Sequence, residues 1–185
     1  LHWYGKEMPA GTDTIQEDFY VPFLQQLRNL LDKTYDTISN DIKEVIQPHI
    51  ERMNGLIDRI EKLSIYLKNS NLNMALCYTD IHNWNLMQSK QQLILIDWEG
   101  LKLAPVEADM IFLVDKPYYN RFLSIYKNHH KDFVIHPDAL QFYQGRRKLE
   151  DIWEFIEQLL FDSQDEQERA ETIDSLKKEL QGLSR

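Results

Sequence analysis

The side chains best suited to chemistry lie in a short central segment of the chain. Asp80 and Asn85 lie in a polar loop that follows an apolar run, and Asp97 comes directly after a second apolar run. Carboxylate and amide oxygens are the hard ligands that Mg²⁺ prefers, beside water and substrate phosphates. A carboxylate that stays off the metal can accept a proton from a hydroxyl group. The segment therefore predicts a metal site with a general base beside it.

Two strand ends joined by a hairpin would bring these side chains to one point. Short apolar runs predict three strands, at Met74–Tyr78, Leu86–Gln88 and Leu93–Ile96. Ser89–Gln91 is predicted as the turn between the last two strands. The stretch from Gly100 to Pro105 is predicted as a loop, because glycine and proline bound it.

Helices are predicted for most of the remaining chain. Apolar residues recur at helical spacing in Thr14–Leu31, Ile38–Leu67, 106–114, Tyr118–Asn128, Pro137–Phe161 and Glu166–Leu180. Pro48 and Gly55 are expected to kink or divide the second of these helices. Residues 1–12 are expected to hold a helix end and a loop. The fold class predicted is α+β, mostly helical, with one small β-hairpin element that carries the polar loop.

The composition limits the partners of the chain. Its 185 residues are enough for one domain with a core, and its net charge of −9 argues against nucleic acid as the main partner. The charge suits a cationic ligand, although solubility alone also accounts for it. One cysteine, Cys77, excludes an internal disulfide, and no apolar run has membrane-spanning length, so a cytoplasmic location is expected. The chain begins with Leu1 rather than methionine, so we expect a fragment or a processed form.

The spacing of the polar residues matches a phosphoryl-transfer site. In kinases, a catalytic-loop aspartate is followed five residues later by an asparagine, and an aspartate after the next strand binds Mg²⁺. Here Asn85 follows Asp80 by five residues, and Asp97 follows Asn85 by twelve. A single aspartate in a loop is commonly only a turn residue. The joint spacing, with a predicted strand before each aspartate, indicates a kinase-like site.

Residues 76–115 resemble the aminoglycoside phosphotransferase family. The resemblance is carried by Leu76-Cys77-Tyr78-Thr79-Asp80-Ile81-His82, by Asn85 and by Asp97-Trp98-Glu99, and the motif is most similar to the spectinomycin phosphotransferase branch. It implies a protein-kinase-like fold of two lobes with ATP between them. Residues 1–185 would form the C-terminal lobe, in which 75–115 is the catalytic loop and metal-binding segment.

The resemblance also implies a role for each matching residue. Asp80 would be the catalytic base, and Asn85 and Asp97 would be the Mg²⁺ ligands. His82 and Asp109 would support the loop through hydrogen bonds. His82 is also a candidate metal ligand, because Asp80-x-His82 resembles a metal-binding pair of metallophosphoesterases. That alternative needs further ligands at later strand ends.

Two departures from the family pattern matter. Tyr78 stands where the family has histidine, at a position that packs and braces, so activity is expected to survive. None of the six glycines forms a glycine-rich phosphate loop, and no strand offers the phosphate-binding lysine. The N-terminal nucleotide lobe is therefore expected to be missing, and the chain alone would be an incomplete enzyme.

Aromatic and acidic side chains are candidates for binding the acceptor molecule. Trp84 and Trp98 flank the catalytic residues, where they either attract a cation through their rings or belong to the core. Acidic residues after the catalytic strands either pair with ammonium groups or form a solvated face; they are Glu99, Glu150, Asp151, Glu154 and Glu157.

These patterns together predict an ATP- and Mg²⁺-dependent phosphotransferase. Its acceptor would be a hydroxyl of a small cationic molecule, such as an aminoglycoside or aminocyclitol antibiotic, and its biological effect would be antibiotic resistance. The alternatives are a choline- or homoserine-type small-molecule kinase and a non-catalytic pseudokinase module. The partners expected are a nucleoside triphosphate, the acceptor and the missing lobe, with no nucleic acid and no membrane.

Overall fold

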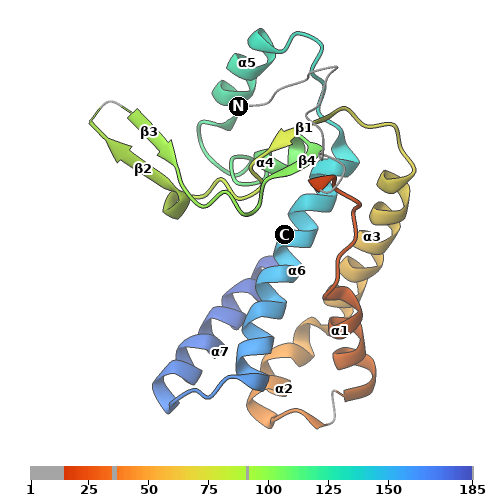
Figure 1. Cartoon of the computed structure of the whole chain (residues 1–185). Helices are drawn as coiled ribbons and strands as arrows, with labels where there is room; N and C mark the ends of the chain where they lie inside the picture. Colours follow the sequence, from red (N-terminus) through yellow and green to blue (C-terminus); the bar gives the residue numbers. More distant parts are fainter. Residues whose placement is uncertain (1–14, 35–36, 91, 185) are drawn as a thin grey trace. The chain divides into compact units, whose positions relative to one another are not determined.

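The computed structural model describes residues 15–34, 37–90 and 92–184, so the helix end expected within residues 1–12 lies outside the described residues. The chain divides into two compact units (Figure 1). The first unit holds the described residues of Leu1–Phe19 and Tyr66–Tyr143, and the second holds those of Tyr20–Ile65 and Gln144–Arg185.

Two short antiparallel sheets form the β part of the first unit (Figure 1). β1 (Met74–Cys77) pairs with β4 (Lys102–Pro105), and β2 (Leu86–Ser89) pairs with β3 (Gln92–Leu95) as a hairpin. The three predicted strands are therefore present. The loop predicted between Gly100 and Pro105 is wrong, because β4 occupies most of it. Pro105 lies in β4, an edge strand of a two-stranded sheet, where proline is tolerated.

The paired strands β1 and β4 carry small side chains that are fully buried. Ala75, Cys77 and Ala104 have no exposed surface, and burial raises the pKa of the Cys77 thiol. The segment before α1 also joins β4, since Gln16 forms a parallel bridge with Leu103. The first unit therefore has a compact centre from which the polar loop after β1 extends.

The first predicted helix begins ten residues later than expected. α1 spans Leu24–Asn29 and continues as the π-helical turn η2 (Leu30–Thr34). Phe19 has a φ of 60°, and its N–H donates to Oε1 of Glu17 at 2.9 Å, which is incompatible with a helix there. Every second residue from Phe19 to Phe23 is buried, a period typical of extended chain rather than helix.

The described part of the second unit is mostly helical from Leu24 onward. Its elements are α1, η2, α2 (Asn40–Ile46), η4 (Gln47–His49), α3 (Ile50–Lys68) up to Ile65, α6 (Pro137–Phe161) from Gln144, α7 (Glu166–Gln181) and η6 (Gly182–Ser184). Its core consists of fully buried aliphatic side chains, among them Leu27, Ile46, Met53, Ile57, Ile60, Leu149, Ile152, Ile156, Leu176 and Leu180. The helical stripes predicted from the sequence supply this core.

Pro48 and Gly55 have different effects on the long helical stretch. Pro48 lies in the 3₁₀ turn η4, which separates α2 from α3, so the predicted division at this proline is confirmed. Gly55 lies inside α3, which continues through it, so a division there is wrong. Apart from the adjacent residues and the backbone of the helix itself, no atom lies within 4 Å of where a Cβ on Gly55 would stand, so the position is open.

The later helices agree closely with the sequence pattern, with one exception. α5 (Tyr119–His129) is displaced by one residue from its prediction, and the bounds of α6 are those predicted. The helix predicted over 106–114 is wrong in length, because α4 spans only Glu107–Met110. The N–H groups of Leu113 and Val114 both reach back to the carbonyl of Met110 and close the chain into turns. None of the helices in the described residues is long and apolar enough to span a membrane.

Candidate active site

A buried carboxylate accepts hydrogen bonds from the backbone of the loop after β1. Asp109 on α4 is only 2% exposed, and its two oxygens accept hydrogen bonds from the backbone N–H groups of Tyr78 (3.1 Å) and Thr79 (2.6 Å). Hydrogen bonds to an ionised carboxylate are stronger than those between neutral groups. Asp109 therefore has the contacts that the predicted support of the catalytic loop requires.

Asp80 is the centre of a polar cluster in the loop. Its Oδ2 lies 2.9 Å from Nδ2 of Asn85 and 3.1 Å from Nε2 of His82. Asn85 is 7% exposed, and its Nδ2 also donates to the backbone carbonyl of Asp80 at 3.1 Å. The structure thus brings together three of the residues predicted from the sequence.

His82 fits the hydrogen-bonded reading better than the metal-ligand reading. Its Nδ1 accepts from the backbone N–H of Trp84 at 3.2 Å, so a neutral ring carries its proton on Nε2 and donates it to Asp80. Both ring nitrogens are engaged within the loop. His82 therefore orients the carboxylate of Asp80 rather than offering a lone pair to a cation.

The two carboxylate oxygens of Asp80 differ in their hydrogen bonds. Its Oδ1 is buried, and no described residue donates a hydrogen bond to it. Buried polar atoms in proteins nearly always have a partner, so such an atom calls for an explanation. A substrate hydroxyl that donates its proton to Oδ1 would satisfy it.

Asp97 follows β3 on the neighbouring turn and is exposed. Its φ is 62°, an uncommon backbone conformation for a residue other than glycine. The preceding residue is fixed on both sides: the N–H of Ile96 donates to the carbonyl of Asn85 at 3.1 Å, and the hydroxyl of Tyr78 donates to the carbonyl of Ile96. Burial, with the negative charges of Asp97 and Asp80, raises the pKa of Tyr78. The two hydrogen bonds at Ile96 join the residue before Asp97 to the loop that carries Asp80 and Asn85.

The oxygen donors of the site fit a magnesium ion that keeps most of its bound water molecules. Nδ2 of Asn85 is turned toward Asp80, and no hydrogen bond from the described residues occupies the amide oxygen, which with the Asp97 carboxylate gives two oxygen donors. Mg²⁺ commonly takes one or two protein oxygens beside water and substrate phosphates. Among the described residues, no group of three or more His, Cys, Asp and Glu side chains is placed to hold a metal ion.

The two tryptophans of the loop are not core residues. Trp84 is 88% exposed, so the core reading is wrong for this residue. Trp98 is 49% exposed, and its ring meets Tyr78 edge-on with the ring centres 5.3 Å apart. Its Nε1 donates to the carbonyl of Leu95 at 3.1 Å. Trp98 therefore packs beside the site, while the Trp84 ring is available to a ligand, and Glu99 is likewise exposed.

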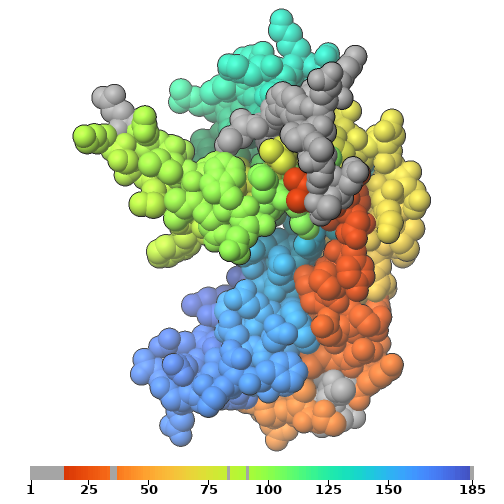
Figure 2. Space-filling view, in the orientation of Figure 1, coloured from red at the N-terminus to blue at the C-terminus, as the bar shows by residue number. Residues whose placement is uncertain are grey.

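The β2–β3 hairpin carries apolar side chains on its surface. Leu93 is 69% exposed and Met87 is 54% exposed, and Ile94 and Ile96 are also exposed. Met87 pairs with Ile94 across the hairpin. In Figure 2 the hairpin, in yellow-green, stands out from the rest of its unit. An isolated two-stranded hairpin is only marginally stable in water, so this surface suits a covering partner.

The acidic residues of α6 lie in the other unit. Asp151 is paired with Arg147 at 2.9 Å, Glu150 lies 3.9 Å from the same guanidinium, and Glu154 accepts a hydrogen bond from Gln158 at 3.4 Å. Burial, opposed by Arg147 and assisted by neighbouring carboxylates, raises the pKa of Asp151 to about 6. The structure does not place these residues in one unit with the catalytic loop.

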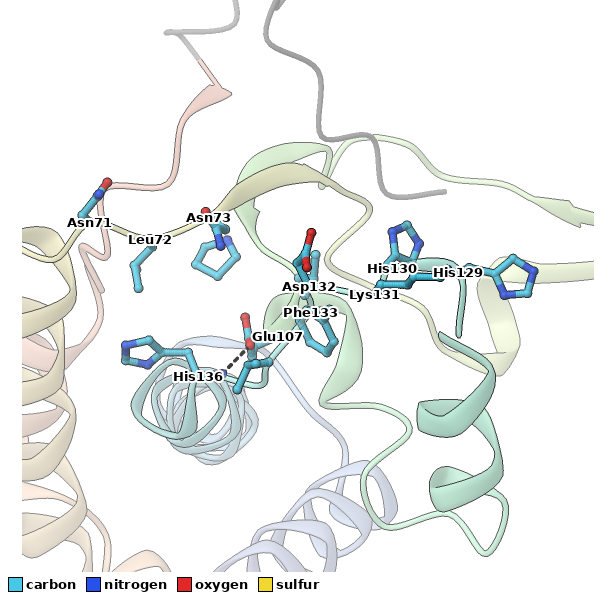
Figure 3. Close-up of a pocket in the computed structure, with 13 residues that line it drawn as sticks. Asn71, Leu72, Asn73, Glu107, His129, His130, Lys131, Asp132, Phe133 and His136 are labelled. Carbon is cyan, nitrogen blue, oxygen red and sulfur yellow. Dashed lines mark hydrogen bonds between the residues drawn. The ribbon is translucent and has the colours of Figure 1, made fainter. Parts of the chain in front are cut away.

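A separate cavity of about 490 Å³ lies elsewhere in the first unit (Figure 3). The buried carboxylate of Glu107 lines it and accepts a hydrogen bond from the N–H of His136 at 2.7 Å. His129 and His130, to which the sequence assigned no role, also line it, while the predicted catalytic residues do not. Its residues come from segments far apart in the chain, so no local pattern indicated it.

Comparison with known proteins adds evidence on the fold. No family model matches the sequence, and a search of curated proteins finds no match. Among solved structures, spectinomycin phosphotransferase in complex with ADP and spectinomycin matches with a TM-score of 0.75, and its AMP-bound complex matches with 0.71. The fold is that of the C-terminal lobe of an aminoglycoside phosphotransferase. The fold class predicted from the sequence is thereby confirmed.

The match is nearly complete for this chain and partial for its neighbour. Both structures are 20% identical to the chain and cover 98% of it. The chain spans about 60% of the length of the neighbour's own chain. The resemblance seen in residues 76–115 therefore extends, as a shared lobe fold, over almost the whole chain.

Proposed function

We propose that the chain is the catalytic and acceptor-binding lobe of an ATP- and Mg²⁺-dependent phosphotransferase. The observation that carries this proposal is the Asp80 cluster, in which Asn85 and His82 hold one carboxylate oxygen and leave the other buried without a partner. This arrangement suits a general base that is held in a fixed direction and accepts the proton of a hydroxyl group through its second oxygen. The kinase-like fold and the ADP-bound neighbour support a nucleotide as the phosphate donor.

Each residue of the cluster has a chemical task in this proposal. Asp80 accepts the proton of the acceptor hydroxyl through Oδ1 as the hydroxyl oxygen bonds to the γ-phosphorus of ATP, and the bond from that phosphorus to the β–γ bridging oxygen breaks to release ADP. Asn85 and His82 fix the direction of the carboxylate, so that little reorganisation is needed during the reaction. Asn85 and Asp97 would hold Mg²⁺, which neutralises phosphate charge when bound.

The nucleotide lobe would come from a part of the protein outside this chain. The sequence has no phosphate loop, and the chain spans about 60% of its structural neighbour. The exposed apolar hairpin that precedes Asp97 supports the proposal that a partner covers it. A nucleotide base and a second lobe would cover Met87, Ile94 and Ile96. The chain alone is therefore expected to fold but not to transfer phosphate.

The acceptor in this proposal is a small cationic molecule such as an aminoglycoside or aminocyclitol. The net charge of −9 favours a cation, and the structural neighbour binds spectinomycin. Carboxylates offset the cost of removing ammonium groups from water. We assign this role to Glu150, Asp151 and Glu154, and also to Glu99 and the exposed ring of Trp84, which lie in the same unit as the base.

A panel of acceptors tests this function. The protein that carries this chain with its nucleotide lobe would be assayed for phosphate transfer to aminoglycosides, aminocyclitols, choline and homoserine. We expect transfer to an aminocyclitol or aminoglycoside, and we expect neutralisation of Glu150, Asp151 and Glu154 together to raise its KM roughly tenfold or more, with the KM for ATP unchanged. A neutral or anionic best acceptor, or an unchanged acceptor KM, would refute the acceptor assignment.

A further inference from the structure

The turn that carries Asp97 is attached to the catalytic loop at both of its ends. The carbonyl of Ile96 precedes the turn and accepts a hydrogen bond from the hydroxyl of Tyr78. The carbonyl of Gly100 follows the turn and accepts from Oγ1 of Thr79 at 2.6 Å. Two consecutive side chains, immediately before Asp80, thus hold the segment Asp97–Glu99 from either side.

Both attached segments contain backbone conformations that need support. Thr79 has a φ of 67° and Asp97 a φ of 62°. Positive φ is uncommon for most side chains and is an outlier for a β-branched residue such as threonine. Such conformations persist where surrounding contacts over-determine them, often at functional sites. The two hydrogen bonds from Tyr78 and Thr79, with the two bonds to Asp109, supply these contacts.

The packing around the two hydroxyls is close. A Cβ on Gly100 would lie 2.8 Å from Oγ1 of Thr79 and 3.1 Å from the carbonyl of Tyr78, so glycine is needed for this approach. Tyr78 is 3% exposed, and its ring meets the ring of Trp98 edge-on. From this packed position the phenol donates to the carbonyl of Ile96.

We propose that Tyr78 and Thr79 are positioning residues that clamp the Asp97 turn onto the catalytic loop. The clamp fixes the direction of the metal-binding carboxylate relative to the base at Asp80. Tyr78, which departs from the family pattern, holds the start of the turn, and Thr79 holds its end. This inference rests on the proposed function, because it assigns the metal to Asp97.

Metal affinity tests the clamp without relying on turnover. Mn²⁺ would serve as the probe, with binding to the complete protein and ATP followed by electron paramagnetic resonance. We expect Tyr78→Phe and Thr79→Val each to weaken Mn²⁺ binding about fivefold, the effect of one lost hydrogen bond. Thr79→Ser keeps the hydroxyl and should bind Mn²⁺ like the wild type. Tyr118→Phe removes an exposed phenol and is the matched control.

The outcomes separate the clamp from the function it rests on. The proposed function would be refuted if the wild-type protein transfers no phosphate and its Mn²⁺ binding, if any, persists in Asp97→Ala. A wild type that does both, with unchanged Mn²⁺ affinity in Tyr78→Phe and Thr79→Val, would refute the clamp alone. Lower thermal stability with unchanged Mn²⁺ affinity would show a purely structural role and also refute it, as would failure of Thr79→Ser to retain the affinity.

Discussion

Replacing Asp109 with asparagine should destabilise the first unit and loosen the catalytic loop. The carboxylate accepts two backbone N–H groups, at 3.1 Å from Tyr78 and 2.6 Å from Thr79, in a site where Asp109 is 2% exposed. Asparagine keeps one oxygen but turns an NH₂ group toward the other N–H, so one charge-assisted bond is lost and a donor is left buried. We expect the free energy of unfolding to fall by about 2–3 kcal/mol.

Urea denaturation of the chain would measure this change, and amide hydrogen exchange would locate it. The N–H groups of Tyr78 and Thr79 should exchange faster in Asp109→Asn, while amides of α7 should not. The matched control is Asp174→Asn, an exposed aspartate on α7 whose loss should change stability by less than about 0.5 kcal/mol. Equal stability of the two variants, with unchanged exchange at Tyr78 and Thr79, would refute the bracing role.

Two further predictions concern stability. Gly100→Ala should lower the free energy of unfolding by about 1–3 kcal/mol, because the new Cβ would lie 2.8 Å from Oγ1 of Thr79. Gly55→Ala should raise it by about 0.5–1 kcal/mol, because the new Cβ would stand in open space within a helix. Equal effects of the two variants in thermal denaturation would contradict this prediction. The pKa of Asp151 is raised from 3.8 to about 6, so the folded state binds more protons between these values and stability should fall as pH rises from about 4 to about 6. Asp151→Asn should flatten that slope in urea denaturation at a series of pH values, and an unchanged slope would exclude the assigned shift.

The parts of the fold that local spacing determines were predictable from the sequence. The helical period of α6 and its proline at the first position predicted its bounds, and the three strands next to the polar loop followed from short apolar runs. The spacing of Asp80, Asn85 and Asp97 predicts one site, and a backbone hydrogen bond from Ile96 to Asn85 joins the residue before Asp97 to the loop that holds Asp80. In each case the signal lies within a few residues of the feature.

The parts that depend on distant contacts were not predictable. β4 forms because it pairs with β1, which lies far from it in the sequence. The start of α1 is delayed because Gln16 pairs with Leu103 in β4 and the N–H of Phe19 bonds to the side chain of Glu17, so this segment does not continue a helix. The apolar run of β3 predicted a strand but not its exposure, because exposure depends on what covers the hairpin. The positive φ of Thr79 also has no local signal, since its support comes from Gly100 and Asp109.

Phosphate transfer by Asp80→Asn is the most direct test of the proposed reaction. The variant would be made in the protein that carries this chain with its nucleotide lobe, and transfer from ATP to the best acceptor would be followed with labelled phosphate. Asparagine preserves the size of the side chain but cannot accept the proton of a hydroxyl, so kcat should fall at least a hundredfold, with the KM for ATP little changed. Asp174→Asn should retain wild-type turnover. Near-normal kcat in Asp80→Asn would contradict the assignment of Asp80 as the base.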